Sequence, residues 1–140
     1  MKLLYLYDEV MGYTLATITE LSKNCDEIHV IHSEKRKLTP FKLHPIKNVI
    51  FYTRSSYSTL MIMDLINSIN PDLTVVSGWQ DRGYLQVASV LRKKCVPVVS
   101  GFDAHWYGSI RQYIASYFSF YLKQYFSHAW VSGPYQFEYA

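Results

Sequence analysis

Residues 71–101, PDLTVVSGWQDRGYLQVASVLRKKCVPVVSG, contain the repeating unit that decides the fold. The apolar runs at residues 72–78 and 96–101 each predict a buried strand. Residues 81–94 predict a helix between them, because their apolar side chains recur at helical spacing, at Leu85, Ala88 and Leu91. Strands that are apolar throughout and are joined by a helix are typical of a parallel sheet covered on both faces.

The same alternation extends along the chain. Further strands are expected at residues 2–7, 27–32, 48–52 and 128–133, and further helices at residues 13–22, 58–69 and 109–126. Right-handed connections between such units give an α/β fold, a Rossmann-like doubly wound parallel sheet with helices on both faces. A chain of 140 residues fits a single domain of this kind.

Composition excludes several classes of protein. The chain is 49% hydrophobic and 18% charged, as globular domains are, and its net charge of +3 is far below that of a nucleic-acid-binding domain. Its two cysteines suggest neither a zinc site nor a disulfide scaffold. The N-terminal apolar run stops at Asp8, too soon for a signal peptide, and no run approaches the roughly 20 residues of a membrane span. We expect a cytoplasmic protein, at most peripheral to a membrane.

Glycine and polar residues follow the predicted strands at their carboxyl ends. Gly12 comes after the first strand, Trp79 and Gln80 come after the fourth, and a polar loop follows the fifth. Ligands bind beyond the carboxyl ends of the strands in open parallel sheets, so this edge predicts a binding cleft. Gly12 would let backbone N–H groups approach an anion or a sugar hydroxyl, or it serves only the turn. One glycine does not make a dinucleotide fingerprint, and no phosphate-binding lysine motif is present.

The loop after the fifth strand carries the strongest candidates for chemistry. Asp103 and His105 would exchange hydrogen bonds with sugar hydroxyls, and a histidine can act as a general base. Trp106 would pack on the apolar face of a sugar. The alternative is that Asp103 or Ser109 caps the next helix and that Trp106 covers the core. Arg111, in the first turn of that helix, suits a phosphate or is an ordinary surface residue.

Aromatic residues are concentrated near the end of the chain. Residues 109–126 form a helical pattern with a wide apolar face, which predicts burial in the core. Because tyrosine tolerates water at its hydroxyl, the face also suits a second domain, a partner or a membrane interface. The basic stretch at residues 33–47 is expected to be a solvated loop, or else a contact with anionic lipid.

A family resemblance rests on residues 71–112, PDLTVVSGWQDRGYLQVASVLRKKCVPVVSGFDAHWYGSIRQ, and on residues 126–140, FSHAWVSGPYQFEYA. They resemble the N-terminal domain of GT-B glycosyltransferases of the family 4 type. The shared features are PD before the fourth strand, the small-residue and Trp turn after it, PVV before a polar loop, and the closing A, V, G, Q and YA positions.

This resemblance implies an enzyme of two Rossmann-like domains. The N-terminal domain mainly binds the acceptor, and the C-terminal domain binds the nucleotide-sugar donor through an acidic motif. Residues 1–140 would be the first of these domains, without the second, and inactive alone. The resemblance further implies a retaining sugar transfer of the hexosyltransferase type, with no metal or other cofactor, onto a lipid-linked or polysaccharide acceptor.

The same resemblance suggests roles for single residues. In the family, a histidine in the loop after the fifth strand contacts the transferred sugar, which points to His105, with Asp103 as the other candidate. Gly12 stands where the family often has a glycine-rich loop near the donor phosphates, although the second glycine is missing. The competing hypothesis is a non-catalytic Rossmann-like binding module that docks through its aromatic helix.

Overall fold

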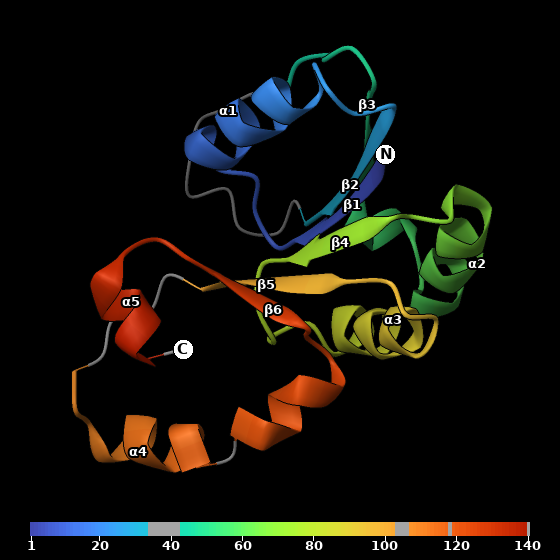
Figure 1. Cartoon of the computed structure of the whole chain (residues 1–140). Coiled ribbons are helices and arrows are strands. Elements are labelled where there is room, and N and C mark those ends of the chain that lie inside the picture. The colour runs from blue at the N-terminus through green and yellow to red at the C-terminus, as the bar shows by residue number, and fades with distance from the viewer. Residues whose placement is uncertain (34–42, 103–106, 118, 140) are drawn as a thin grey trace.

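A computed structural model describes residues 1–33, 43–102, 107–117 and 119–139 of the chain. They form one parallel sheet of six strands in the order β3-β2-β1-β4-β5-β6 (Figure 1). The strands are β1 (Lys2–Tyr7), β2 (Glu27–His32), β3 (Val49–Thr53), β4 (Leu73–Val76), β5 (Val98–Phe102) and β6 (His128–Val131). The order of the strands reverses between β1 and β4, which makes their carboxyl ends the topological switch point of the sheet.

Helices connect these strands and cover the sheet. The α-helices are α1 (Gly12–Leu21), α2 (Thr59–Ile69), α3 (Arg82–Lys93), α4 (Ile110–Tyr117) and α5 (Pro134–Tyr139), and the 3₁₀ helices are η1 (Arg54–Ser56) and η2 (Ser119–Gln124). Helix α1 lies over one face of the sheet, and α2 and α3 lie over the other (Figure 1). The predicted doubly wound α/β fold is thus confirmed. Across the part of the chain that the structure describes, no helix is long and apolar enough to cross a bilayer.

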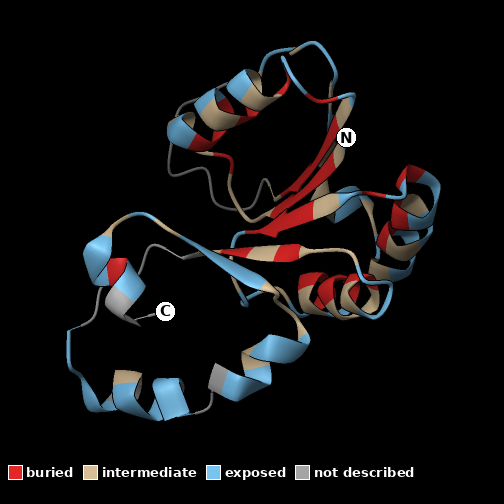
Figure 2. Cartoon of the chain, viewed as in Figure 1, coloured by how far each residue is buried: buried red, intermediate tan, exposed pale blue. Residues whose placement is uncertain are grey.

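The core consists of two apolar layers separated by the sheet. Leu4 and Leu6 of β1 pack with α2 and α3, whereas Leu3 and Tyr5 pack with α1. This division follows from the alternation of side chains along a strand. Buried residues are concentrated in β1, β2 and the facing sides of α2 and α3 (Figure 2). The strands at the centre of the sheet therefore read as continuous apolar runs because both of their faces are covered.

The ends of α2 follow local chemistry that the sequence indicated. Ser58 caps the first turn, since its hydroxyl accepts a hydrogen bond of 3.2 Å from the backbone N–H of Met61. The helix ends at Asn70, whose φ of 50° places it in the left-handed region directly before Pro71. A proline disfavours helical backbone in the residue before it, so the helix stops where the sequence predicts.

The prediction of one buried aromatic helix at residues 109–126 is wrong in two respects. Helix α4 ends at Tyr117, and Ser119–Gln124 is the 3₁₀ helix η2. The predicted burial of the apolar face is also wrong, because these large side chains are exposed: Ile110, Tyr113, Ile114, Tyr117, Phe120 and Tyr121. Among the aromatic side chains of this stretch that the structure describes, Tyr125 and Phe126, at its end, pack against the core. Helical periodicity shows which side chains share a face, but it does not show what covers that face.

Two residues of α2 test this division between core and surface. Ile62 is fully buried between α2 and the sheet, whereas Leu60 is 77% exposed on the same helix. We expect Ile62→Ala to lower the free energy of unfolding by about 2–5 kcal/mol, because it leaves a cavity in the core. Leu60→Ala is the matched control and should change it by no more than about 0.5 kcal/mol. Urea unfolding measures both, and equal losses would contradict the described packing.

Candidate functional site

The loops after β1 and β4 meet at the switch point of the sheet. The backbone N–H of Asp8, directly after β1, donates a hydrogen bond of 3.2 Å to the Ser77 hydroxyl, directly after β4. The Ser77 N–H in turn donates to the carbonyl oxygen of Leu6 at 3.0 Å. Beyond these bonds the two loops diverge, since α1 and α3 cover opposite faces. This is the position where open α/β sheets bind ligands.

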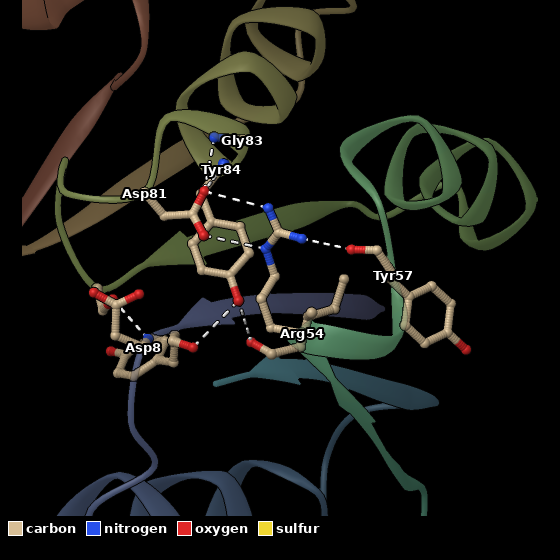
Figure 3. Close-up of polar contacts among 9 residues, drawn as sticks. Asp8, Arg54, Tyr57, Asp81, Gly83 and Tyr84 are labelled. Atoms are coloured by element: carbon tan, nitrogen blue, oxygen red, sulfur yellow. Dashed lines mark hydrogen bonds and ion pairs between the residues drawn. The ribbon is translucent and has the colours of Figure 1, made fainter. Parts of the chain in front are cut away.

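An arginine and an aspartate face each other across this edge. Arg54 follows β3, and its guanidinium donates from Nε to Oδ2 of Asp81 at 3.1 Å and from Nη2 to Oδ1 at 3.4 Å (Figure 3). Nη1 donates to the carbonyl oxygen of Tyr57. Oδ1 of Asp81 also accepts from the N–H groups of Gly83 and Tyr84, at 2.7 and 3.1 Å, and so caps α3. One carboxylate therefore holds both the helix and the arginine.

Tyr84 connects α3 to the ends of the central strands. Its ring is 1% exposed, and its hydroxyl lies 3.1 Å from the carbonyl oxygen of Ile31 and 3.3 Å from that of Tyr7 (Figure 3). Burial, and then the Asp81 carboxylate, raise the pKa of the Tyr84 phenol. The hydroxyl consequently stays protonated and can donate. With the Arg54 guanidinium carbon 5.4 Å from its ring centroid, Tyr84 completes a network of Arg54, Asp81 and Tyr84.

Trp79 and Gln80, predicted to bind substrate, lie in the short loop between β4 and this network. The loop turns at Gly78, whose φ of 141° is one that side-chain-bearing residues rarely adopt. Trp79 is 42% exposed after the turn, and Gln80 is exposed beside it. The structure thus places both residues at the carboxyl edge of β4, as the sequence predicted.

Gly12, the other predicted contact in the described region, is the first residue of α1. It is partly exposed, and the N-cap residue Met11 makes no side-chain hydrogen bond to the helix. The chain reaches this turn through Asp8 and Glu9, whose carboxylates repel phosphate but accept hydrogen bonds from hydroxyl groups. The charge at this end of β1 suits a polyhydroxylated ligand better than a bare phosphate.

The remaining predicted site residues follow β5. Asp103, His105 and Trp106 lie outside the described residues, so their predicted roles stay predictions. Arg111 belongs to the first turn of α4, as expected, but its side chain lies outside the description. The cap of α4 is Ser109: its hydroxyl accepts from the Gln112 N–H at 3.3 Å, and Oε1 of Gln112 accepts from the Ser109 N–H at 3.3 Å. This reciprocal pair is a capping box. Of the two residues that the sequence offered as caps, Asp103 and Ser109, it is Ser109 that caps α4.

Charged groups at the opposite edge of the sheet pair with one another and with the backbone. The N-terminal ammonium group pairs with Asp26, which lowers the pKa of that carboxyl. The Lys2 N–H donates to Asp72 at 2.7 Å, and the Lys2 ammonium lies 3.6 Å from Glu27. These contacts fasten the turns at this edge to one another.

Sequence reasoning missed Arg54 and Tyr84. Asp81 could have been identified as a cap from its position before α3. Arg54 is 27 residues from Asp81, and the Tyr84 hydroxyl bonds carbonyl groups that are 53 and 77 residues away. Contacts of this range leave no periodic signal in a single sequence.

The Tyr84 hydroxyl gives a test of this network. We expect Tyr84→Phe to lower the free energy of unfolding by about 1–2 kcal/mol, because the carbonyl groups of Tyr7 and Ile31 lose their shared donor. Tyr13→Phe, at an exposed ring on α1, is the matched control and should have no effect. Urea unfolding at neutral pH compares them. An unchanged stability of Tyr84→Phe would show that the hydroxyl makes no stabilising bond.

The raised pKa of Tyr84 also predicts a dependence on alkaline pH. An unfolded tyrosine releases its proton near pH 10, whereas the folded chain holds it to higher pH, so stability is full below about pH 10 and falls above it. Above that pH, Tyr84→Phe should make the fall of the free energy of unfolding with pH shallower by about 1.4 kcal/mol per pH unit, which corresponds to one proton. Urea unfolding between about pH 10.5 and 11.5 measures the slope. A slope equal to that of the unsubstituted chain would contradict the burial of this phenol.

The sequence matches the model of the glycosyl transferase 4-like family over residues 2–126. No curated protein matches the chain significantly. Similar solved structures include the Bordetella bronchiseptica enzyme WbmG in complex with NAD, with a TM-score of 0.56 at 16% identity over 74% of this chain and 38% of that one. The same enzyme in complex with NAD and UDP gives 0.52 at 16% identity, over 72% and 37%.

The two comparisons carry different information. At 16% identity the likeness to WbmG is one of fold, and this chain spans well under half of that enzyme's length. The family model, in contrast, covers most of the chain, including the first five strands, the Arg54–Asp81 pair and the Trp79 loop. The chain belongs to the glycosyl transferase 4-like family.

Proposed function

We propose that this chain is the N-terminal, acceptor-side domain of a glycosyltransferase. The enzyme would transfer a hexose from a nucleotide-sugar to a glycan or lipid-linked acceptor, with retention of configuration, in polysaccharide biosynthesis. The observation that carries the proposal is that a glycosyl transferase 4-like chain gathers carboxylates, an amide and an indole ring at the switch point of its sheet. These groups are those that recognise sugars.

The chemistry of this edge supports the acceptor side. Carboxylates such as Asp8 and the amide of Gln80 exchange hydrogen bonds with hydroxyl groups, and the half-exposed ring of Trp79 offers an apolar surface to a sugar. A nucleoside diphosphate would meet the negative charges of Asp8 and Glu9 here. We therefore assign the donor mainly to a second domain, outside residues 1–140. The complex of WbmG with NAD and UDP supports nucleotide binding on a related fold.

The reacting sugar is assigned to the loop after β5. In the proposal, His105 or Asp103 contacts the transferred sugar, and Trp106 packs against it. Arg111, near the N-terminus of α4, helps to balance the charge of the leaving diphosphate, and Gly12 gives backbone access at α1. No metal or other cofactor is assigned to the reaction. The site of action is the cytoplasm or the inner face of the cell membrane, where a lipid-linked acceptor would lie.

A second candidate function is a non-catalytic Rossmann-like interaction module. The observation that favours it is the exposed aromatic surface of α4 and η2, including Tyr117 and Phe120. Exposed apolar surface of this kind often marks a contact with another protein or domain. The two candidates differ in one respect, since only the enzyme releases a nucleoside diphosphate from a nucleotide-sugar.

Substitutions in the β5 loop test the enzyme. In the complete enzyme that contains this domain, we expect His105→Ala or Asp103→Ala to reduce sugar transfer by about 100-fold or more, because a group at the reacting sugar is lost. Tyr107→Ala, at an exposed neighbouring position, is the control and should leave activity unchanged. Release of nucleoside diphosphate from a panel of nucleotide-sugars, with membranes of the source cell as acceptor, measures the rate.

Three results would contradict parts of this proposal. Full activity in both loop variants would remove Asp103 and His105 from the site. Turnover by residues 1–140 alone would overturn the two-domain enzyme. No release by the complete protein from any nucleotide-sugar tested would favour the interaction module.

A further inference from the structure

We propose that Arg54 is a positioning residue, which fixes the loop of residues 77–81 and thereby the orientation of Trp79 and Gln80 toward the acceptor. The inference rests on the proposed function for the identity of the ligand. Its structural part, that Arg54 determines the order of this loop, stands on the contacts alone.

Arg54 reaches Asp81 from a different part of the sheet. It directly follows β3, at one edge of the sheet, whereas Asp81 follows β4, and two strands, β2 and β1, lie between β3 and β4. The arginine therefore extends across the carboxyl ends of the strands to reach Asp81 (Figure 3). The side chains are 20% and 23% exposed, so water screens this pair less than it screens a pair on the open surface.

The loop of residues 77–81 is held at both of its ends. At its beginning, Ser77 bonds to the backbone of Leu6 and Asp8. At its end, Asp81 accepts bonds both from the first turn of α3 and from Arg54. Trp79 lies between these two anchors, directly after the turn at Gly78. Among the described residues, Arg54 is the side chain that bonds Asp81 directly from another part of the sheet, so losing it would leave this end of the loop fastened to α3 alone.

The surroundings of Arg54 match the geometry of a guanidinium group. The two bonds to Asp81 and the third to the Tyr57 carbonyl use the fixed fork of an arginine, which an ammonium group cannot reproduce. Gly83 leaves the necessary space. A Cβ there would lie 2.6 Å from Nη2 of Arg54 and 2.7 Å from the Thr59 hydroxyl. The Arg54 guanidinium therefore fits beside the start of α3 because residue 83 is a glycine.

Hydrogen exchange distinguishes a purely structural ion pair from a positioning residue. Loss of a structural pair raises hydrogen exchange throughout the chain, in proportion to the lost stability. Loss of a positioning residue raises exchange in one loop and leaves the core protected. The environment of Trp79 would change with the loop, while the environment of Ile62 and the rest of the core would not.

The experiment compares Arg54→Lys and Arg54→Ala with Arg82→Ala, an exposed arginine in the first turn of α3. Hydrogen–deuterium exchange of residues 77–84 is measured on the 140-residue chain. Acrylamide quenching of Trp79 is measured with the other two tryptophans replaced by phenylalanine. We expect exchange of the loop to rise about tenfold in Arg54→Ala, with quenching increased and β1 exchange unchanged. Arg54→Lys should restore only part of the protection, and Arg82→Ala should match the unsubstituted chain.

Activity links the loop to the acceptor. In the complete enzyme, assayed with source-cell membranes, Arg54→Lys should increase about tenfold the amount of membrane needed for the half-maximal rate, with kcat nearly unchanged. Unchanged exchange and quenching in both Arg54 variants, or an equal rise of exchange in β1, would overturn the positioning role. A loosened loop with an unchanged half-maximal membrane amount would overturn its link to the acceptor. Absence of transfer by the unsubstituted enzyme would instead overturn the proposed function, and exchange would still decide the role of Arg54.

Discussion

The parallel direction of all six strands is the constraint on which the rest of the structure depends. Successive parallel strands require a crossover connection, and the connection through α1 runs over one face of the sheet, whereas those through α2 and α3 run over the other. The sheet is consequently covered on both sides, and its central strands are apolar on both sides. Every strand then delivers its carboxyl end to the same edge, where polar residues such as Asp8, Ser77 and Gln80 follow the strands without disturbing the core.

That edge is held together by a few long-range polar contacts. Arg54, Asp81 and Tyr84 connect the ends of β1, β2 and β3 to the start of α3. The network keeps its charges balanced, since the guanidinium offsets the carboxylate and the phenol stays neutral. In the proposed function, a rigid frame of this kind, with Trp79 and Gln80 on the loop that it fixes, would supply the fixed geometry that recognition of a polyhydroxylated acceptor requires.

Most of the fold could be predicted from the sequence because each strand and helix has a local pattern of apolar and capping residues. The apolar runs at residues 2–7 and 27–32 match β1 and β2 to the residue, and Ser58 and Pro71 mark the ends of α2. The failure at residues 109–126 has a physical cause, because periodicity cannot show whether another surface covers a face. Around the candidate site, the sequence could place Gly12, Trp79 and Gln80 at the carboxyl edge of the sheet because each follows a strand, and their binding role stays a prediction. Arg54 and Tyr84 could not be identified in this way, since their partners are distant in the sequence.

The central claim is that the carboxyl edge of β1 and β4 is the surface that meets the acceptor. Backbone chemical shifts of the isotope-labelled chain, recorded while a polysaccharide fraction from the source cell is added, test it most directly. We predict shifts confined to the residues after β1 and β4, at Asp8–Gly12 and Ser77–Asp81, with none at Lys2, Asp26 or Asp72 on the opposite edge. Shifts at the opposite edge, or none at the carboxyl edge, would contradict the claim.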